Sequence, residues 1–168
     1  VKYGTLGIAV TGADAPQSIT LASGANWAAL SGSPPTAKHI AVVREFVVVG
    51  NITASANRVQ WSASNSATGW TVGTNESNYQ DIPDGGVIQA IIGGEVGYVF
   101  QERQIVRMVR VPAPITFQFD VVEQARGALA PYSVVPVGNG VFYLAPDGFY
   151  FFDGVQSVPI GQNGIDQT

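Results

Sequence analysis

Short runs of β-forming residues, separated by polar or glycine-containing turns, make up most of the chain. The run KHIAVVREFVVVGN holds two apolar stretches, Ile40–Val43 and Phe46–Val49, on either side of Arg44-Glu45. This pattern favours a tight hairpin with both charges at its tip, and one long bulged strand is the alternative. A further strand, Arg58–Trp61, alternates between apolar and polar positions. We therefore expect mainly β-structure.

The same pattern returns in the second half of the chain. Strands are expected up to Ile92 and at Gly97–Gln101, Gln104–Val111, Ile115–Val122, Ser133–Val137, Val141–Leu144, Phe149–Phe152 and Ser157–Ile160. The turns between them contain Gly93-Gly94, Asn139-Gly140, Asp147-Gly148 and Asp153-Gly154. Such dipeptides favour the positive φ that tight turns require. At most one helical turn is expected, near Glu123–Ala130.

Three units share one order, in which an apolar strand, a short polar tip and an aromatic strand follow one another. The aromatic strands are 51 residues apart from Val47 to Tyr98 and 44 residues apart from Tyr98 to Phe142. Periods of about 40 to 50 residues with four short strands each are typical of β-propeller blades. The predicted fold class is therefore all-β and β-propeller-like, with about three four-stranded antiparallel blades visible. Since about four to eight blades close a ring, we expect a part of a larger propeller.

Two features divide the chain. Pro34-Pro35 stops regular structure, because proline lacks a backbone N–H and fixes its own φ. Residues 1–33 are thus expected as an N-terminal segment of strand and loop, either separate or part of a preceding blade. Residues 34–168 are expected to hold the blades, with a long polar insertion at 57–86. Within 1–33 we expect one strand at Thr5–Val10 and a second short strand or loop that carries Trp27.

The insertion at 57–86 carries three aromatic residues spaced nine apart, Trp61, Trp70 and Tyr79, among Asn, Ser, Thr and Gly. Such a segment cannot form a core of its own, so we expect an interface loop pinned by its aromatic residues. A stacking platform for sugar rings is the alternative. The bacterial sialidase repeat S-x-D-x-G-x-T-W is not matched, since the nearest text, SNSATGWT, lacks the Asp and reverses the last two residues.

Composition supports a folded β-protein. The chain has 168 residues, of which 46% are hydrophobic and 12% charged, with 20 glycines and 10 prolines. These values suit a domain of ordinary size built from short strands and tight turns. A net charge of −4 argues against a surface that grips nucleic acid. No apolar run approaches the roughly 20 residues of a membrane-spanning helix, so no membrane contact is expected.

Few residues suggest chemistry. The chain has no cysteine and one histidine, His39, for which we expect a packing role at a strand edge. Asp81 and Asp84 are candidate ligands of a hard cation, but Pro83 and the glycines after Asp84 favour an ordinary turn. The GxGxxG, Walker, GxSxG and HExxH motifs are absent. We therefore expect no enzyme, no cofactor and no metal site.

Arg103, Arg107 and Arg110 are placed on one strand, beside Glu102. One interpretation is a basic strip that faces a partner protein or the DNA of a channel. The other, which we favour, is an ion-paired or solvated face of a sheet.

Several linked segments resemble one protein family. In chain order they are RVQWS, DIPDGG, GGExGYVFQER, FQFD, LxxDGFYxFDG and PIG, and the similarity spans about Pro34 to Asp166. Their order and spacing resemble the packaged-DNA stabilisation, or tail-hub (nozzle), proteins of short-tailed bacteriophages and prophages. The resemblance implies a structural virion protein of the tail, non-enzymatic and containing a β-propeller. Two alternatives stay open, namely a carbohydrate- or receptor-binding propeller module and a propeller scaffold for protein partners in a cell.

The resemblance also implies partners. It implies a homo-oligomeric ring, a hexamer, below the portal and adaptor proteins and beside other tail proteins. The ring would form part of the channel for double-stranded DNA, which passes without sequence specificity. It would retain the packaged genome until ejection.

Overall fold

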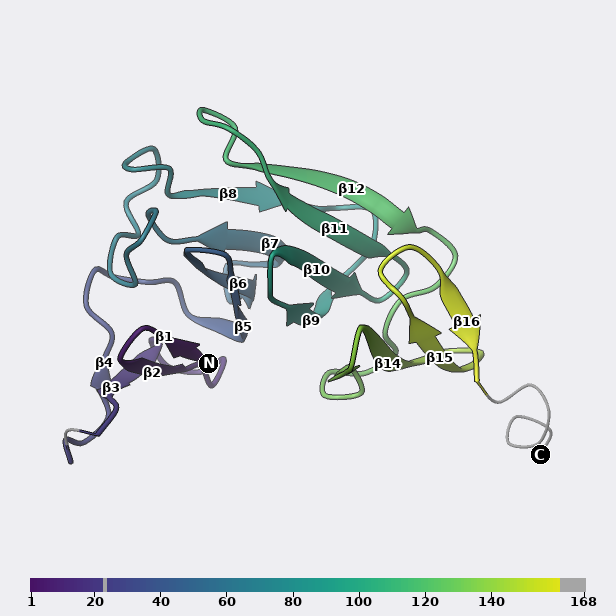
Figure 1. The fold of residues 1–168 in the computed structure, drawn as a ribbon, viewed down its shortest axis with the longest axis horizontal. Helices are drawn as coiled ribbons and strands as arrows, with labels where there is room; N and C mark the ends of the chain where they lie inside the picture. The colour runs from purple at the N-terminus through teal and green to yellow at the C-terminus, as the bar shows by residue number, and fades with distance from the viewer. Residues whose placement is uncertain (23, 161–168) are drawn as a thin grey trace.

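The structure is a computed structural model that describes residues 1–22 and 24–160. These residues form four four-stranded antiparallel sheets and contain no helix. Figure 1 shows the sheets following one another in an arc, from the purple N-terminal sheet to the yellow C-terminal one. The predicted all-β, propeller-like fold class is confirmed. The expected helical turn near Glu123–Ala130 is not formed.

Each sheet consists of four strands that are consecutive in sequence. Sheet A contains β1 (Lys2–Tyr3), β2 (Leu6–Ala9), β3 (Gln17–Thr20) and β4 (Ala28–Ala29). Sheet B contains β5 (Ala37–Val43), β6 (Phe46–Ile52), β7 (Ser55–Trp61) and β8 (Asn78–Asp81). Sheet C contains β9 (Ile88–Ile92), β10 (Val96–Gln101), β11 (Ile105–Arg110) and β12 (Phe117–Glu123). Sheet D contains β13 (Val135–Val137), β14 (Gly140–Ala145), β15 (Gly148–Phe152) and β16 (Ser157–Pro159).

Sheet A is one more sheet than the three that the sequence pattern revealed. Its strands are only two to four residues long and rich in Gly, Ala and Ser, so their alternation is too short to stand out. Trp27 lies just before β4, and Pro34-Pro35 lies between sheets A and B. Whether residues 1–33 and 34–168 are separate domains stays a prediction.

The turns between strands lie close to where glycine and polar residues predicted them. The β5–β6 hairpin turns at Arg44-Glu45, with Arg44 at φ 52°. The β13–β14 hairpin was expected to turn at Asn139-Gly140. Its positive φ falls instead on Gly138, at 57°, and Gly140 pairs with Val137 in the ladder. Tight turns need a residue that tolerates positive φ, and here two glycines compete for that position.

The insertion predicted at 57–86 is interrupted by sheet B. β7 runs to Trp61 and β8 covers Asn78–Asp81, so the segment divides into a loop of residues 62–77 and the start of the connection between β8 and β9. Tyr79 therefore lies on the outer strand of sheet B and not in the loop. Polar composition hid β8, because an outer strand is half solvated and tolerates Asn, Gln and Asp.

The hydrophobic core lies between the sheets, in three clusters. The A–B cluster contains Ile8, Leu30, Val47, Val49 and Trp70. The B–C cluster contains Phe46, Val48, Val59, Trp61, Val99, Met108 and Phe117. The C–D cluster contains Phe100, Ile105, Val141, Tyr143, Tyr150 and Phe152. Because successive side chains point to opposite faces, β6 serves two clusters and every one of its residues is buried.

The first strand of each sheet lies on the concave side of the arc, and the last strand lies on its outer side (Figure 1). Sheets B and C also meet through backbone atoms, because the amide N of Gly94 donates to the carbonyl of Val42 at 3.0 Å. A Cβ on Gly93 would lie 2.1 Å from that same carbonyl oxygen, so only glycine fits there. This order of strands is that of propeller blades, and within the described residues the arc stays open.

Candidate interaction surface

The three aromatic residues predicted to mark an interface do not come together. Trp61 is 2% exposed in the B–C cluster and Trp70 is 4% exposed in the A–B cluster, on opposite faces of sheet B. Each indole N–H donates to a loop carbonyl at 2.8 Å, Trp61 to Glu76 and Trp70 to Ala67. Both tryptophans therefore hold loop 62–77 against the core.

Tyr79 is the exposed one of the three, with 41% of its surface accessible. The Arg58 guanidinium lies 3.9 Å from its ring centroid and donates to both carboxylate oxygens of Asp81, at 2.6 and 2.8 Å. These hydrogen bonds hold the pKa of Asp81 below its ordinary value. A sugar platform would thus rest on a single ring, one of whose two faces is already covered by Arg58.

The three arginines do not form a basic strip. Arg103 lies in the turn before β11, where its side chain is 65% exposed and donates to the carbonyl of Asp84 at 3.0 Å. Arg107 and Arg110 are both on β11, but three positions apart, so they lie on opposite faces of sheet C. Arg107 is paired with Asp120 of β12 at 3.0 Å. The three-residue spacing of Arg107 and Arg110 in the sequence already predicts that they lie on opposite faces of a strand.

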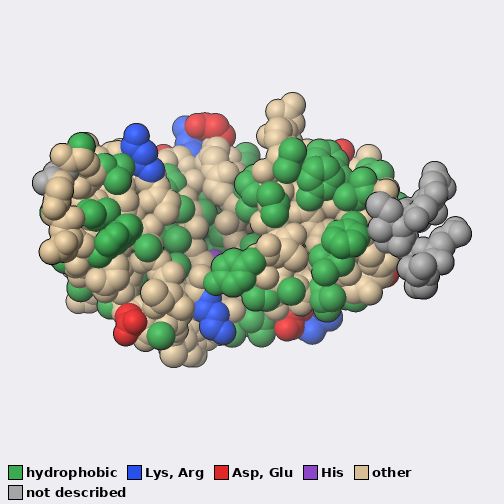
Figure 2. Space-filling model, turned by 90° about the horizontal axis from the view of Figure 1, so that it is seen from below, with side chains coloured by type: hydrophobic (Ala, Val, Ile, Leu, Met, Phe, Trp, Pro, Cys, Tyr) green, Lys and Arg blue, Asp and Glu red, His purple; other side chains and the backbone are tan. Residues whose placement is uncertain are grey.

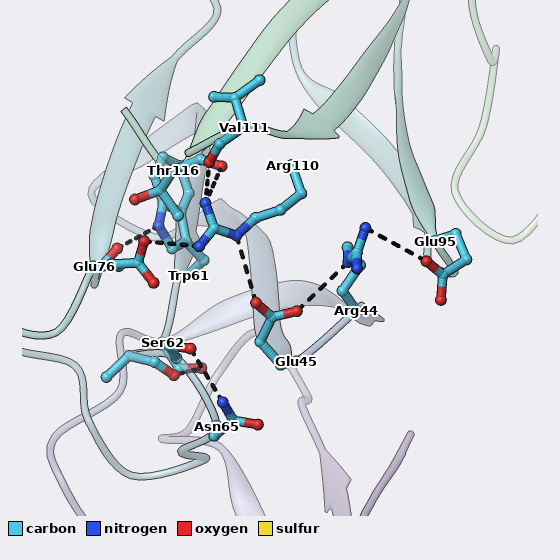
Figure 3. A network of polar contacts seen from close by, with 12 residues as sticks. Arg44, Glu45, Trp61, Ser62, Asn65, Glu76, Glu95, Arg110, Val111 and Thr116 are labelled. Carbon is cyan, nitrogen blue, oxygen red and sulfur yellow. Dashed lines mark hydrogen bonds and ion pairs between the residues drawn. The ribbon is translucent and has the colours of Figure 1, made fainter. Parts of the chain in front are cut away.

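Arg110 holds sheets B and C together (Figure 3). Its side chain is 19% exposed and forms ion pairs with Glu76 at 2.8 Å and with Glu45 at 3.4 Å. It also donates to the carbonyls of Val111 and Thr116. Glu45 comes from the β5–β6 turn and Glu76 from loop 62–77, so one guanidinium binds three segments. Its role as a partner-facing group stays a prediction, and its partners here lie within the chain.

His39 lines a hollow of about 330 Å³ on the concave side of the arc, together with Gln89 of β9 and Tyr132 before β13. It lies on β5 opposite Gly50, and its Nε2 is buried without a hydrogen-bond partner. Burial lowers the pKa of His39, the nearby Lys38 charge adds to this effect, and a hydrogen bond with the Ile88 backbone opposes it.

Acidic side chains do not gather into a metal site. Among residues 1–22 and 24–160, no group of three or more His, Asp or Glu side chains could hold a metal ion. Asp81 is paired with Arg58, and the carbonyl of Asp84 accepts from Arg103. None of the described residues forms a helix long and apolar enough to span a membrane.

Sheet D presents one apolar face that no other part of the described chain covers. On β14, Val141, Tyr143 and Ala145 point into the C–D cluster, so Phe142 and Leu144 point the opposite way. The strand register places five more apolar side chains on that side. This sheet D face consists of Val135, Val137, Phe142, Leu144, Phe149, Phe151 and Val158.

The sheet D face is unusual for a free surface. All of its side chains are apolar, and the Phe142 and Phe151 rings are in contact, with centroids 5.0 Å apart. Val135, Val137, Phe149 and Val158 are each about half exposed. This face could not be recognised from the sequence, because the continuous runs VFYL and FYFF are typical of strands covered on both sides. Contiguous apolar patches of this kind mark sites of protein contact.

By the fold of residues 1–22 and 24–160, this is an all-β protein with four blade-like sheets in the described part. A scan against protein-family models and a search of curated proteins find no match to it. Only the fold and the sheet D face are therefore available for assigning this chain to a class of protein.

Proposed function

We propose that this chain is a structural, non-enzymatic protein of a phage tail, acting in the hub or nozzle or in the head-to-tail connection. In this role it forms part of a ring-shaped DNA channel and helps to retain packaged DNA. The observation that carries the proposal is the sheet D face, whose seven apolar side chains form a surface for protein contact. The resemblance of segments such as DIPDGG and FQFD to tail-hub proteins is the reason for assigning this contact to a phage tail.

The placement of the charged residues supports a structural role. Ion pairs at 2.6 to 3.0 Å join Arg58 to Asp81, Arg107 to Asp120, and Arg126 to Asp147. The first pair links two neighbouring strands of sheet B, and the second links two neighbouring strands of sheet C. The third pair links the segment before sheet D to the β14–β15 turn. Each of these charged side chains has a partner of opposite charge within the chain, so none of them requires a catalytic explanation.

The charge of the chain suits a channel through which DNA must move. A net charge of −4 leaves no excess of lysine and arginine to neutralise phosphates, so DNA would pass without being gripped. Retention would then come from closing the channel with protein. In the proposed tail the partners are further copies in a hexameric ring, the adaptor and the portal.

The proposal is tested by deleting the gene from its phage. We expect heads that package DNA normally but lose it, so that the genome becomes sensitive to added nuclease. In parallel, the purified full-length protein is mixed with the adaptor protein of the same genome and imaged by electron microscopy. Ring particles bound to the adaptor are the expected result. A full-length protein that stays monomeric, does not bind the adaptor and is dispensable for DNA retention would refute the proposal.

A further inference from the structure

The hollow beside His39 has the size of a small-molecule site. Its volume of about 330 Å³ lies at the lower end of the roughly 300 to 1,000 Å³ that ligand sites occupy. Its walls come from β2, β5, β9 and the segment just before β13. Figure 2 looks onto this concave side and shows hydrophobic side chains around a recess near the middle of the molecule. The hollow therefore depends on the packing of several sheets and not on one loop.

Most of the wall of the hollow is apolar. The larger aliphatic side chains that line it are Ile8, Ile40, Ile91, Ile92 and Val134. A hydrocarbon group that lies against them leaves water, and each methylene buried in this way strengthens binding by about fourfold. The hollow therefore favours a ligand with a short apolar part.

The polar side chains of the wall can donate hydrogen bonds. Lys38 is exposed, and its stem lies over Gly12, where a Cβ would be 2.7 Å from the Lys38 Cγ. Among the described residues Lys38 forms no ion pair, unlike the six arginines. Gln89 and Tyr132 add an amide and a hydroxyl, and no Asp or Glu of the described chain lines the hollow. An unpaired ammonium beside neutral donors suits a carboxylate.

His39 adds a titratable ring to the same wall. Lys38 is the charged side chain that acts on it, whereas β6 and β9 bring no charged group and the ring meets the Ile88 backbone. The Val1 amine also borders the hollow, but it donates to the carbonyl of Ile8 at 2.7 Å. Burial and the Lys38 charge lower the pKa of His39. A carboxylate in the hollow would stabilise the protonated ring and raise that pKa.

We propose that the hollow binds a small carboxylic acid with a short apolar tail. Lys38 and Gln89 hold the carboxylate, and the tail lies against Ile40 and Ile92. This binding goes beyond the proposed structural role and does not depend on the phage setting. Every residue that it uses lies within the described part of the chain.

The test uses the imidazole resonances of His39 as a reporter, since the chain has one histidine. Sodium butyrate is titrated into the 168-residue chain at about pH 7 and constant ionic strength, followed by NMR. We expect a saturable shift with a Kd of about 1 mM, in keeping with a ligand of few atoms. Acetate, which is two methylenes shorter, should bind about 15-fold more weakly. Butyramide has nearly the same shape without the charge, and it should give no saturable shift up to about 20 mM.

Two lysine variants test the position of the charge. Lys38→Met keeps an apolar stem over Gly12 and should weaken butyrate binding by about tenfold or more. Lys2→Met, on β1 and outside the hollow, removes the same charge and should bind butyrate as the wild type does. Butyrate should also raise the pKa of His39 in the wild type and in Lys2→Met, but not at the same concentration in Lys38→Met. Circular dichroism checks that both variants are folded.

Any of three results would overturn the proposal. The first is a wild-type chain whose His39 resonances show no saturable shift up to about 20 mM butyrate. The second is butyramide binding as tight as that of butyrate, because the charge would then not be recognised. The third is an equal effect of Lys38→Met and Lys2→Met, which would indicate unspecific attraction of anions. Binding of the adaptor is not affected by any of these results, so the proposed function is tested separately.

Discussion

Arg110 shows how one side chain can decide the contact between two sheets. Its guanidinium satisfies Glu45 and Glu76, which come from separate turns, and lies 5.4 Å from the centroid of the Phe46 ring. Its side chain and both carboxylates are less than 30% exposed. Partly buried charges are costly without partners, so Arg110 and Glu76 depend on each other, whereas Glu45 also pairs with Arg44 at 3.6 Å.

Arg110→Met should lower the free energy of unfolding by about 2 to 4 kcal/mol, because it leaves Glu76 without its cation and leaves Glu45 with Arg44 alone, at 3.6 Å. Methionine keeps the apolar contact with Phe46, so the loss reports the charge. Urea unfolding followed by fluorescence measures it. Arg103→Met, at an exposed turn, is the control and should change stability by less than about 0.5 kcal/mol. Equal effects of the two variants would contradict a structural role for Arg110.

Tyr143 is a second residue whose burial has a measurable consequence. It lies in the C–D cluster, and its hydroxyl is hydrogen-bonded to that of Ser157 at 2.8 Å. Burial raises the pKa of Tyr143 to about 12. An acid whose folded pKa is raised contributes full stability below its unfolded pKa, which is 10.0 for tyrosine. That contribution is lost as the pH rises from about 10 to about 12.

The wild-type protein should thus lose roughly 2 to 3 kcal/mol of stability through Tyr143 between about pH 10 and 12. Tyr143→Phe should cost about 1 kcal/mol at neutral pH, through the lost hydrogen bond, and should flatten the alkaline decline. Urea unfolding at a series of pH values tests both effects. Tyr132→Phe, at a ring that is 85% exposed, is the matched control and should follow the wild-type curve. An equally steep decline in Tyr143→Phe would contradict the assignment.

At the scale of elements, loop 62–77 contributes a side chain to the hydrophobic core and is not only a surface connection. It connects β7 to the outer strand β8, and Trp70 from its middle packs between sheets A and B. The backbone N–H of Val47 donates to the Ser62 hydroxyl at 3.0 Å, which ties the start of the loop to β6. The use of this loop as a contact for another subunit stays a prediction, and Val72 is the large apolar side chain that it exposes.

Trp70→Ala should destabilise the protein by about 3 to 5 kcal/mol, because it opens a cavity between two sheets. Tyr79→Ala, nine positions later on β8, should cost less than about 1 kcal/mol, because it loses mainly the contact with Arg58. Thermal and urea unfolding compare the two variants. A glycan array should therefore be read with the Tyr79→Ala variant, which is expected to stay folded. Loss of glycan binding in that variant would support a carbohydrate-binding role. A mild effect of Trp70→Ala would mean that the loop is not part of the core.

At the scale of the whole molecule, charge is distributed in pairs. Of the eight Lys and Arg residues, Arg44, Arg58, Arg103, Arg107, Arg110 and Arg126 each form an ion pair with Asp or Glu. Phosphate binding needs cations that are free to replace counterions, and these are already neutralised. The acidic surplus adds repulsion, so the surface should let DNA slide past it.

The chain should therefore bind double-stranded DNA with a Kd weaker than about 100 μM at about 0.15 M salt. Fluorescence anisotropy of a labelled duplex measures this, and a repeat at about 0.02 M salt detects any weak attraction, since electrostatic binding strengthens as salt falls. Tight binding with a steep dependence on salt would contradict the proposal that DNA passes the channel without being gripped.

The sequence alone predicted most strands of sheets B to D and placed most turns to within a residue or two, because alternation and turn chemistry are local properties. The pair Arg44-Glu45 predicted the β5–β6 hairpin, and the repeat of about 44 to 51 residues predicted blade-like units, both as the structure has them. Sheet A was missed as a complete unit, since strands of two residues carry almost no periodic signal.

Only the tertiary structure decided which faces are covered and which charges meet. The sequence gives no reason to expect Trp61 and Trp70 to differ in exposure or to lie on different faces. Packing buries them on opposite sides of sheet B. Arg110 pairs with Glu45, 65 positions earlier in the chain, because sheets B and C pack together. Local sequence patterns do not predict which sheets pack together. The continuous run FYFF likewise predicts a strand buried on both faces, whereas among residues 1–22 and 24–160 sheet D has a neighbouring sheet on one side only. Burial depends on what lies next to a strand in space, and alternation along a strand cannot reveal that neighbour.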